Sequence, residues 1–282
     1  MGEHRTGIAV AVTVLGFSFA AAAADLEPAI GAAAVPPAVS LPPAPYDWTI
    51  LIGAEGRFEP IFQGSKDNTW RPYPVFDFHR YGGPDNFRGP RDGIGIGVVN
   101  FGGLSIGPVG QLKIARRESD DPTALHGLGN VPWAVELGVF AEYWWVPWLR
   151  TRAEVRQGFN GHHGIVSDIT ADAVVPVGSQ LTLSAGPRVE VVTSAATSPY
   201  FSINAVQSAA SGLAVFDAKG GIRAAGAGGQ ARYLWTPEWA THAFVEYDRL
   251  LGDAANSPLV VQRGSVNQLT LGAGATYNFN IK

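Results

Sequence analysis

A strict two-residue alternation marks the last segment of the chain, residues 269–279. Every second position is apolar and the series ends in aromatic side chains, whereas the positions between them are small or polar. The side chains of a β-strand point alternately to its two faces, and a transmembrane barrel strand turns its apolar face to lipid. The segment therefore predicts a membrane-spanning strand. Its apolar face consists of Leu269, Leu271, Ala273, Ala275, Tyr277 and Phe279.

Similar alternation recurs along the chain from residue 48 onward. It predicts an all-β fold, a closed up-and-down antiparallel transmembrane β-barrel of about 12 strands, with 10–14 as the range that fits. The expected strands lie near residues 48–58, 70–80, 94–98, 104–114, 133–143, 149–156, 165–175, 180–192, 220–234, 239–251 and 266–280, with a short one within 81–92.

The expected connections differ in length on the two sides of the membrane. Three short turns, near 146–148, 176–180 and 235–238, fall on one side. Longer loops fall on the other side, as barrels with short periplasmic turns and long outer loops show. These loops are 116–132, 193–219 and 252–265.

Two segments precede the expected barrel, which occupies residues 48–282. Residues 1–24 are typical of a cleaved secretory signal peptide, because His4 and Arg5 precede a short apolar stretch and a run of alanines. Residues 25–47 are rich in Pro and Ala and are expected to form an extended periplasmic arm. The arm is either a plain linker or a binding segment for a partner.

Composition narrows the class of protein further. Charged residues make up 16% and hydrophobic residues 46% of the chain, yet no apolar run of about 18 residues follows the N-terminal segment, so helical membrane spans are not expected. The sequence has no cysteine, which excludes disulfides and thiolate metal sites. A net charge of −4 argues against a general nucleic-acid-binding protein.

The tryptophans give an independent indication. Each of them lies at the end of an expected strand or in a turn, and none lies in mid-strand. Indole side chains prefer the membrane–water interface, where transmembrane barrels carry aromatic girdles. We therefore expect an interface girdle that consists of Trp48, Trp70, Trp133, Trp144, Trp145, Trp148, Trp235 and Trp239.

Charged side chains fall on the strand faces opposite to the apolar ones. An arginine that faced lipid near the bilayer midplane would cost about 2–4 kcal/mol, so these side chains are expected to face the interior. They would form either a charged constriction that passes small solutes or a salt-bridged plug, and the near-equal numbers of the two signs favour the plug. The candidates are Glu136, Glu142, Arg150, Arg152, Glu154, Arg156, Arg188, Glu190, Glu246 and Asp248.

No residue pattern typical of an enzyme or a cofactor site stands out. His162 and His163 with Ser167 and Asp168 suggest catalysis or metal binding, but adjacent histidines in an extended segment point to opposite sides. Residues 226–231 have the glycine spacing of a dinucleotide fingerprint, but the sequence that follows is not helical. We expect no catalytic residue, no cofactor and no metal.

Several segments carry a resemblance to a known family. Residues 247–258 read Tyr-Asp-Arg-Leu-Leu-Gly-Asp-Ala-Ala-Asn-Ser-Pro, and residues 264–268 read Gly-Ser-Val-Asn-Gln. Together with 211–213 and the opening segments 57–65 and 72–80, they resemble the MltA-interacting protein (MipA)/OmpV family of outer-membrane proteins. The resemblance implies a β-barrel in the outer membrane of a Gram-negative bacterium.

The resemblance also implies a function. In the best-known member it implies a non-enzymatic scaffold that brings a lytic murein transglycosylase together with a murein synthase, and other members are described as adhesins. Three functions are therefore expected to compete: a scaffold for peptidoglycan enzymes, a channel for small solutes through the charged interior, and an adhesin that acts through its outer loops. The expected partners are outer-membrane lipid and, on the resemblance, the two murein enzymes, with no nucleic acid.

Overall fold

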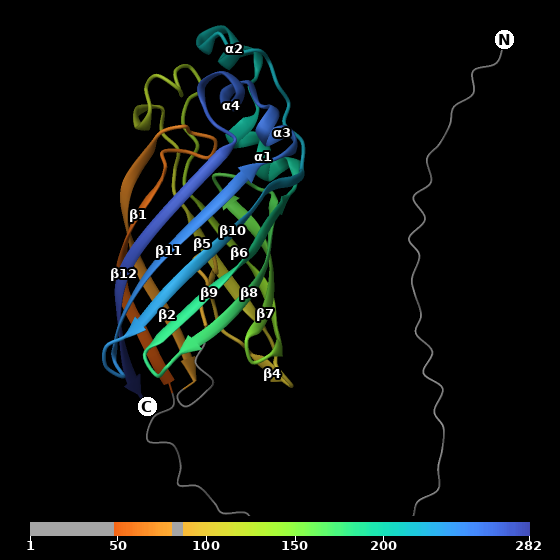
Figure 1. The fold of residues 1–282 in the computed structure, drawn as a ribbon. Coiled ribbons are helices and arrows are strands. Elements are labelled where there is room, and N and C mark those ends of the chain that lie inside the picture. The colour runs from red at the N-terminus through yellow and green to blue at the C-terminus, as the bar shows by residue number, and fades with distance from the viewer. Residues whose placement is uncertain (1–47, 81–86) are drawn as a thin grey trace, which may run out of the picture. The chain divides into compact units, whose positions relative to one another are not determined.

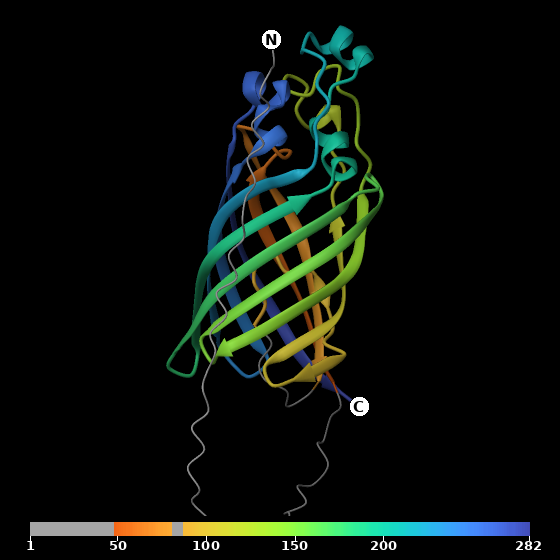
Figure 2. The same cartoon turned by 90° about the vertical axis from the view of Figure 1, so that its right-hand side faces the viewer.

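The computed structural model describes residues 48–80 and 87–282, which form a barrel with helices gathered at one end (Figures 1 and 2). The expected signal peptide (1–24) and arm (25–47) lie outside the described residues. Within them, the strands are β1 (Trp48–Pro60), β2 (Asn68–Arg80), β3 (Ile94–Gly95), β4 (Val99–Phe101), β5 (Leu104–Lys113), β6 (Ala134–Val146), β7 (Leu149–Asn160), β8 (Ile165–Val177), β9 (Leu181–Val192), β10 (Gly221–Leu234), β11 (Trp239–Leu250) and β12 (Asn267–Ile281).

The strands form one antiparallel sheet that curls back on itself. Their order is β2-β1-β12-β11-β10-β9-β8-β7-β6-β5-β3, and β4 pairs with β5. The first and last long strands are joined, with Trp48 opposite Ile281 and Phe58 opposite Leu271. The prediction of an all-β, antiparallel barrel of about 12 strands is confirmed, and the barrel, predicted to be closed, is nearly so. Among the described residues, no helix has the length and hydropathy needed to cross a membrane.

The two ends of the barrel differ. Short turns join β6 to β7, β8 to β9 and β10 to β11 at one end, whereas the helices of the described residues lie in the loops at the other end (Figure 1). Outer-membrane barrels carry short turns on the periplasmic side and longer loops outside. We therefore refer to these as the periplasmic end and the outer end.

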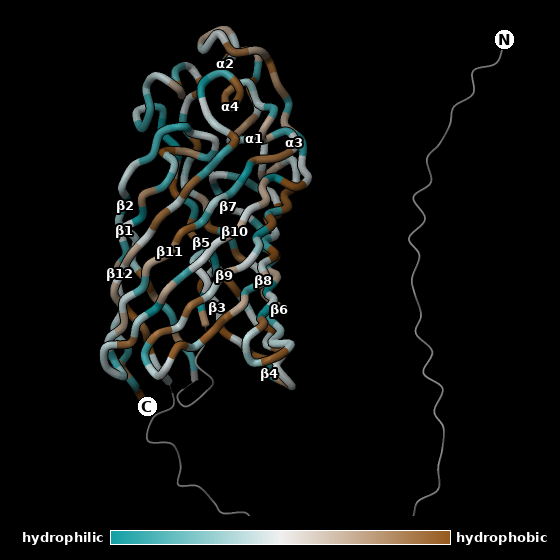
Figure 3. Tube along the Cα trace, in the orientation of Figure 1, coloured by the Kyte–Doolittle hydropathy of each residue, from teal (hydrophilic) through white to brown (hydrophobic). Residues whose placement is uncertain are grey.

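Burial along the strands is the reverse of that in a soluble sheet. Arg150 in β7 has an exposed fraction of 0%, whereas Val139 in β6 is 59% exposed and Ile169 in β8 is 51% exposed. Hydropathy changes from residue to residue along the strands in the same way (Figure 3). Apolar side chains outside and charged side chains inside are typical of a barrel that is surrounded by lipid.

One line along the barrel wall lacks strand pairing, and we call it the seam. It lies between β2, which pairs with β1 alone, and β3, which pairs with β5 alone, so no ladder joins the two in the described residues. β3 pairs only at Ile94 and Gly95, so β5 has no strand partner on this side beyond Gly110. Across the seam, the Arg88 side chain donates to the carbonyl oxygen of Phe76 in β2 at 2.8 Å.

Two prolines adapt β2 to its place at the seam. The N–H of Ile61 donates to the carbonyl oxygen of Asp67 at 3.0 Å, which marks this pair as hydrogen-bonded. Hydrogen-bonded pairs recur at every second residue of an antiparallel ladder, so the odd-numbered residues of β2 bond to β1 and the even-numbered ones face away from it. Pro72 and Pro74 belong to the other set, whose nitrogens face the seam. An unpaired strand edge in lipid leaves N–H groups unsatisfied, and proline has no N–H to leave.

Residues 87–93, which we call the inner segment, lie in the barrel interior. A short strand is expected within 81–92; residues 81–86 of this range lie outside the described residues, and residues 87–92 form no strand. Asp92 accepts a hydrogen bond from Arg150 of β7 at 2.6 Å, and Arg91 forms an ion pair with a carboxylate of β11. The inner segment therefore bonds to inward-facing side chains instead of a neighbouring strand, which is why its sequence does not alternate.

A folded cap covers the outer end. Its two larger hydrophobic clusters join loops that are far apart in the sequence: Phe201 packs with Val260, and Phe62 packs with Leu128 and Leu259. The barrel wall encloses charged side chains, so the apolar core of this protein lies in the cap. The helices of the cap are η1 (Glu118–Asp120, a 3-10 helix), α1 (Ser194–Phe201), α2 (Ala205–Ser211), α3 (Gly252–Asn256) and α4 (Pro258–Arg263).

Hydrogen bonds tie the cap together. The Ser257 hydroxyl donates to the carbonyl oxygen of Phe201 at 2.7 Å, and Arg263 donates to the carbonyl oxygen of Ala124 at 3.0 Å. α2 starts at Asn204, whose side-chain oxygen accepts a hydrogen bond from the N–H of Gln207 in a capping box. The loops at the outer end are thus a packed unit.

The variant Phe201→Ala should loosen the cap while the barrel stays folded. Phe201 is fully buried, and removal of such a ring costs about 3–5 kcal/mol. We expect faster proteolysis in the loops 116–132 and 193–219, with unchanged heat-modifiable gel mobility of the barrel. Val206→Ala, on an exposed position of α2, is the control. If Phe201→Ala and Val206→Ala resisted proteolysis equally well, Phe201 would not be part of the hydrophobic core of the cap.

Candidate functional site

The charged side chains of the barrel wall form ion pairs in the interior. Each of the ten side chains expected there from the sequence takes part in at least one ion pair with a described residue. Nine of them belong to one connected network, and Glu190 pairs separately with Arg223. The ten are Glu136, Glu142, Arg150, Arg152, Glu154, Arg156, Arg188, Glu190, Glu246 and Asp248.

Arg150 is the most deeply buried of these side chains. Its guanidinium donates to Asp92 at 2.6 Å, to Glu142 at 2.7 Å and to Asp172 at 3.2 Å. Carboxylates from the inner segment, β6 and β8 therefore converge on one arginine. A buried charge is tolerated only when it is paired and hydrogen-bonded, so these contacts fix the inner segment to the wall.

Arg156 continues the network toward the outer end. It donates to Glu136 at 3.0 Å and to Asp168 at 2.5 Å, and it bonds to Glu154, which also accepts from a neighbouring arginine. Glu136 in turn contacts Nε2 of His162 at 2.9 Å. Cations and carboxylates thus alternate through the interior, and each arginine of the network contacts more than one carboxylate, as in a plug.

Five Asp and Arg residues that form ion pairs with these ten side chains were not among those expected in the interior from the sequence. Asp168 and Asp172 lie four residues apart on the inward face of β8. The alternation of that strand would have been enough to predict that both side chains point inward. Arg223 lies at an irregularity in the β10–β9 pairing, which breaks the alternation. No pattern in the sequence indicated that Arg91 and Asp92 lie in the interior, because the inner segment is not a strand and has no alternation.

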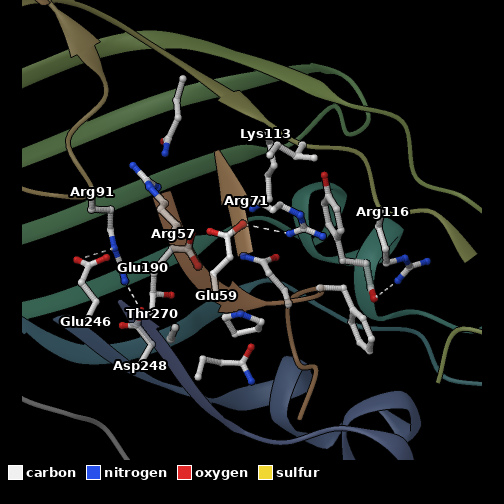
Figure 4. A pocket seen from close by; sticks show the side chains of 18 of the residues that line it. Arg57, Glu59, Arg71, Arg91, Lys113, Arg116, Glu190, Glu246, Asp248 and Thr270 are labelled. Carbon is white, nitrogen blue, oxygen red and sulfur yellow. Dashed lines mark hydrogen bonds and ion pairs between the residues drawn. The ribbon is translucent and has the colours of Figure 1, made fainter. Parts of the chain in front are cut away.

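The side chains of the interior leave two cavities. The larger, of about 300 Å³, lies in the outer half under the cap (Figure 4). The smaller, of about 50 Å³, is lined by Asp77, Phe87 and Arg152 among others. The ion pairs that Arg152 and Arg156 form with Glu154 run from one cavity to the other. We call the larger one the outer cavity.

Two polar residues line the outer cavity where it meets the cap. Arg116 donates a hydrogen bond to the carbonyl oxygen of Tyr200 at 2.8 Å. Burial lowers the pKa of Arg116 to about 10 and raises the pKa of Tyr200 to about 12. At neutral pH the guanidinium therefore stays charged and the phenol stays protonated, so both offer hydrogen-bond donors to the cavity.

The tryptophans of the expected girdle lie toward both ends of the wall. Trp70 and Trp133 lie toward the outer end, and the other six lie near the periplasmic end. Trp144 differs from the expected interface position, because it donates from its indole N–H to the inward carboxylate of Glu142 at 2.9 Å. Trp145 is exposed and contacts the ring of Tyr143, whereas Trp144 contacts Phe87 of the inner segment, so the two indoles lie on opposite faces of the wall.

The histidine cluster does not come together in space. His162 is buried against Glu136, whereas the adjacent His163 is exposed, and Asp168 is buried on the face of β8 that Ser167 does not share. These side chains form no nucleophile–base pair. In residues 48–80 and 87–282, no group of three or more His, Asp and Glu side chains is placed to hold a metal ion.

A nearly closed antiparallel barrel with an apolar outer surface and ion pairs inside defines an outer-membrane β-barrel protein. The chain belongs to the MltA-interacting protein family, since the family model described as MltA-interacting protein MipA matches residues 52–279. The match runs from β1 to β12 and includes the cap. A comparison with curated proteins finds no match.

Three solved structures that the chain matches are described as a porin, an outer membrane channel and an outer membrane protein. The NanC porin is 8% identical with a TM-score of 0.40, and the alignment covers 82% of this chain and 98% of that one. The COG4313 outer membrane channel from Pseudomonas putida F1 is 11% identical with a TM-score of 0.40, covering 84% and 97%. OprG from Pseudomonas aeruginosa is 10% identical with a TM-score of 0.31, covering 83% and 97%.

The segment that most resembles the family lies largely in the cap. Residues 247–258 run from the end of β11 through α3 to the start of α4. Leu250, Ala254 and Ser257 in this segment are buried. The segment therefore packs the cap together and presents no cluster of reactive groups.

The pair of Arg223 and Glu190 offers a test of the plug. The two nitrogen–oxygen distances are 2.6 and 2.5 Å, and Arg223 is buried. Arg223→Met should destabilise the folded barrel by about 3–5 kcal/mol, because it leaves a buried carboxylate unpaired. The double variant Arg223→Met, Glu190→Leu should recover most of that loss. Urea unfolding in lipid vesicles measures both, and equal losses in the two variants would contradict a structural ion pair.

Proposed function

We propose that this protein is a non-enzymatic scaffold for peptidoglycan-processing enzymes in the outer membrane. The observation that carries the proposal is an interior filled by ion pairs beneath a packed cap. In such a barrel no open pore is left between the ion pairs, so its surfaces are the part that is available to protein partners. Membership of a family named for interaction with MltA supports a lytic murein transglycosylase as one partner, and the resemblance extends this to a murein synthase.

The proposed contact lies at the periplasmic end, on the hairpin of β4 and β5. Phe101 at its tip is 82% exposed, beside the turn residues Gly102 and Gly103, which have φ angles of 55° and 87°. Val99 on the same hairpin is also exposed. Exposed apolar side chains next to a turn are typical of a protein contact. The arm 25–47, outside the described residues, is proposed as a second contact.

The variant Phe101→Ser tests this contact in a pull-down of a lytic murein transglycosylase by the refolded barrel. We expect binding to fall by about tenfold or more, because loss of a large apolar anchor costs more than about 1.4 kcal/mol. Phe159→Ser is the matched control, since Phe159 is also exposed but lies at the outer end of β7. Unchanged binding by Phe101→Ser, or equal losses in both variants, would contradict the assigned contact.

A channel for small solutes is the second candidate function. The outer cavity favours it, because about 300 Å³ of polar space lies within the barrel. The ion pairs of Arg152, Glu154 and Arg156 oppose it, because they occupy the space between this cavity and the smaller one. Conduction would require these side chains to separate.

Planar bilayers distinguish a plug from a channel. We expect the refolded barrel to give no steady conductance steps while its heat-modifiable mobility shows that it is folded. The variant Arg150→Ala, Arg152→Ala, Arg156→Ala removes three cations of the network and provides the comparison, provided that it passes the same folding check. Steady wild-type steps with an ion selectivity that shifts in the variant would establish a channel and overturn the plug.

A further inference from the structure

The outer cavity reaches through the barrel wall at the seam. A cavity inside a barrel touches only every second residue of a paired strand, because the others point outward. β11 and β12 follow this rule: they contribute Glu246, Asp248, Gln268 and Thr270. Within β5 the cavity is instead lined by the three consecutive residues Gln111, Leu112 and Lys113, although Leu112 is 65% exposed on the outer face. The cavity therefore extends past the inner face of β5 to its unpaired edge.

This edge is free because the ladder beside it ends. On the seam side, the last strand partner of β5 lies opposite Gly110. The next residue with backbone groups on that side is Leu112, which has no strand partner there among the described residues. The free edge of β2 lies on the other side of the seam, and its inward side chains Arg71 and Tyr73 line the same cavity.

The outer surface around this opening is apolar. Leu112 is 65% exposed and Trp70 is 68% exposed, and Ile114 is also exposed. Indole side chains mark the membrane–water interface, so Trp70 places the opening at the level of the lipid head groups in the outer leaflet. A molecule that enters here comes from the membrane, with its apolar part against these side chains.

Two of the cations that line the cavity take no part in its ion pairs. Each carboxylate that lines the outer cavity has an arginine partner. Lys113 and Arg116, which also line it, form no ion pair with a described residue. Nζ of Lys113 lies 5.2 Å from the ring of Tyr200. The Tyr200 hydroxyl and Nε of Arg116 are buried and have no hydrogen-bond partner among the described residues.

We propose that the outer cavity binds the phosphate head group of a lipid, which enters from the outer leaflet through the seam. Phosphate oxygens accept charge-assisted hydrogen bonds from ammonium and guanidinium groups, and Lys113, Arg116 and Tyr200 supply these donors. A volume of about 300 Å³ is at the lower end of the range for ligand pockets, which suits a head group and leaves the acyl chains outside. This site is independent of the proposed scaffold role.

The test uses the folded barrel in a maltoside detergent, titrated with short-chain phosphatidylglycerol and followed by native mass spectrometry. Lys113→Gln should weaken binding by about tenfold or more, because one charge-assisted hydrogen bond is lost. Lys113 forms no ion pair with a described residue, so the variant is expected to fold, and heat-modifiable mobility checks this. Lys66→Gln makes the same change on an exposed lysine of the β1–β2 loop and should leave binding unchanged.

Two further probes identify the source of the phosphate. Glycerol phosphate represents a free anion, and a short-chain diacylglycerol glucoside represents the acyl chains without a phosphate. Both should bind at least about tenfold more weakly than phosphatidylglycerol. The proposal is overturned if either probe binds as tightly as the lipid, or if Lys113→Gln and Lys66→Gln bind the lipid equally well.

The route through the seam has its own readout. A phosphatidylglycerol with a photoactivatable group near the start of one acyl chain should crosslink to Leu112 or Ile114 in the folded barrel. Excess unlabelled phosphatidylglycerol should remove this crosslink. Crosslinks confined to strands away from β2 and β5 would overturn entry through the seam.

Discussion

The arginine and carboxylate side chains enclosed by the strands of this barrel are buried mainly as partners of one another, and the arrangement of the interior follows from that constraint. The wall turns Arg150 inward with two carboxylates of the neighbouring strands, and the inner segment adds Asp92 as a third. The same segment places Arg91 among carboxylates of β8 and β11. A chain that could have continued the wall instead completes the charge pairing of the interior.

The seam is a consequence of this arrangement. Because residues 87–93 lie inside, β2 and the outer half of β5 are left without a strand between them. Lipid offers no partner to the free backbone groups, so the edges must be made tolerable in other ways. Pro72 and Pro74 remove N–H donors from β2, and Arg88 binds a carbonyl oxygen that β2 leaves free. The outer cavity lies beside Leu112, where the edge of β5 has no strand partner among the described residues.

The sequence was a good guide wherever a residue's environment depends only on which face of a strand it occupies. Alternation predicted the strands and placed Glu136 and Arg156 on inward faces. It predicted nothing for Arg91 and Asp92, since their environment depends on the path of a segment without periodicity. The packing of the cap could not be predicted from the sequence either. Its helices α3 and α4 have five and six residues, which is too short for a helical periodicity to be recognised. The core of the cap joins Phe62, Leu128 and Leu259, and no local pattern connects loops that far apart.

The cap and the plug together decide from which side the interior can be reached. Phe201 and its neighbours cover the outer end with an apolar core, so a polar solute from outside meets packed side chains and not an open mouth. The ion pairs of Arg152 and Arg156 with Glu154 obstruct the way from the periplasmic end. The remaining approach to Lys113 and Tyr200 is sideways, through the seam. On the two proposals made above, the interior communicates through the seam with the membrane that surrounds the barrel, and the periplasmic surface holds a protein partner.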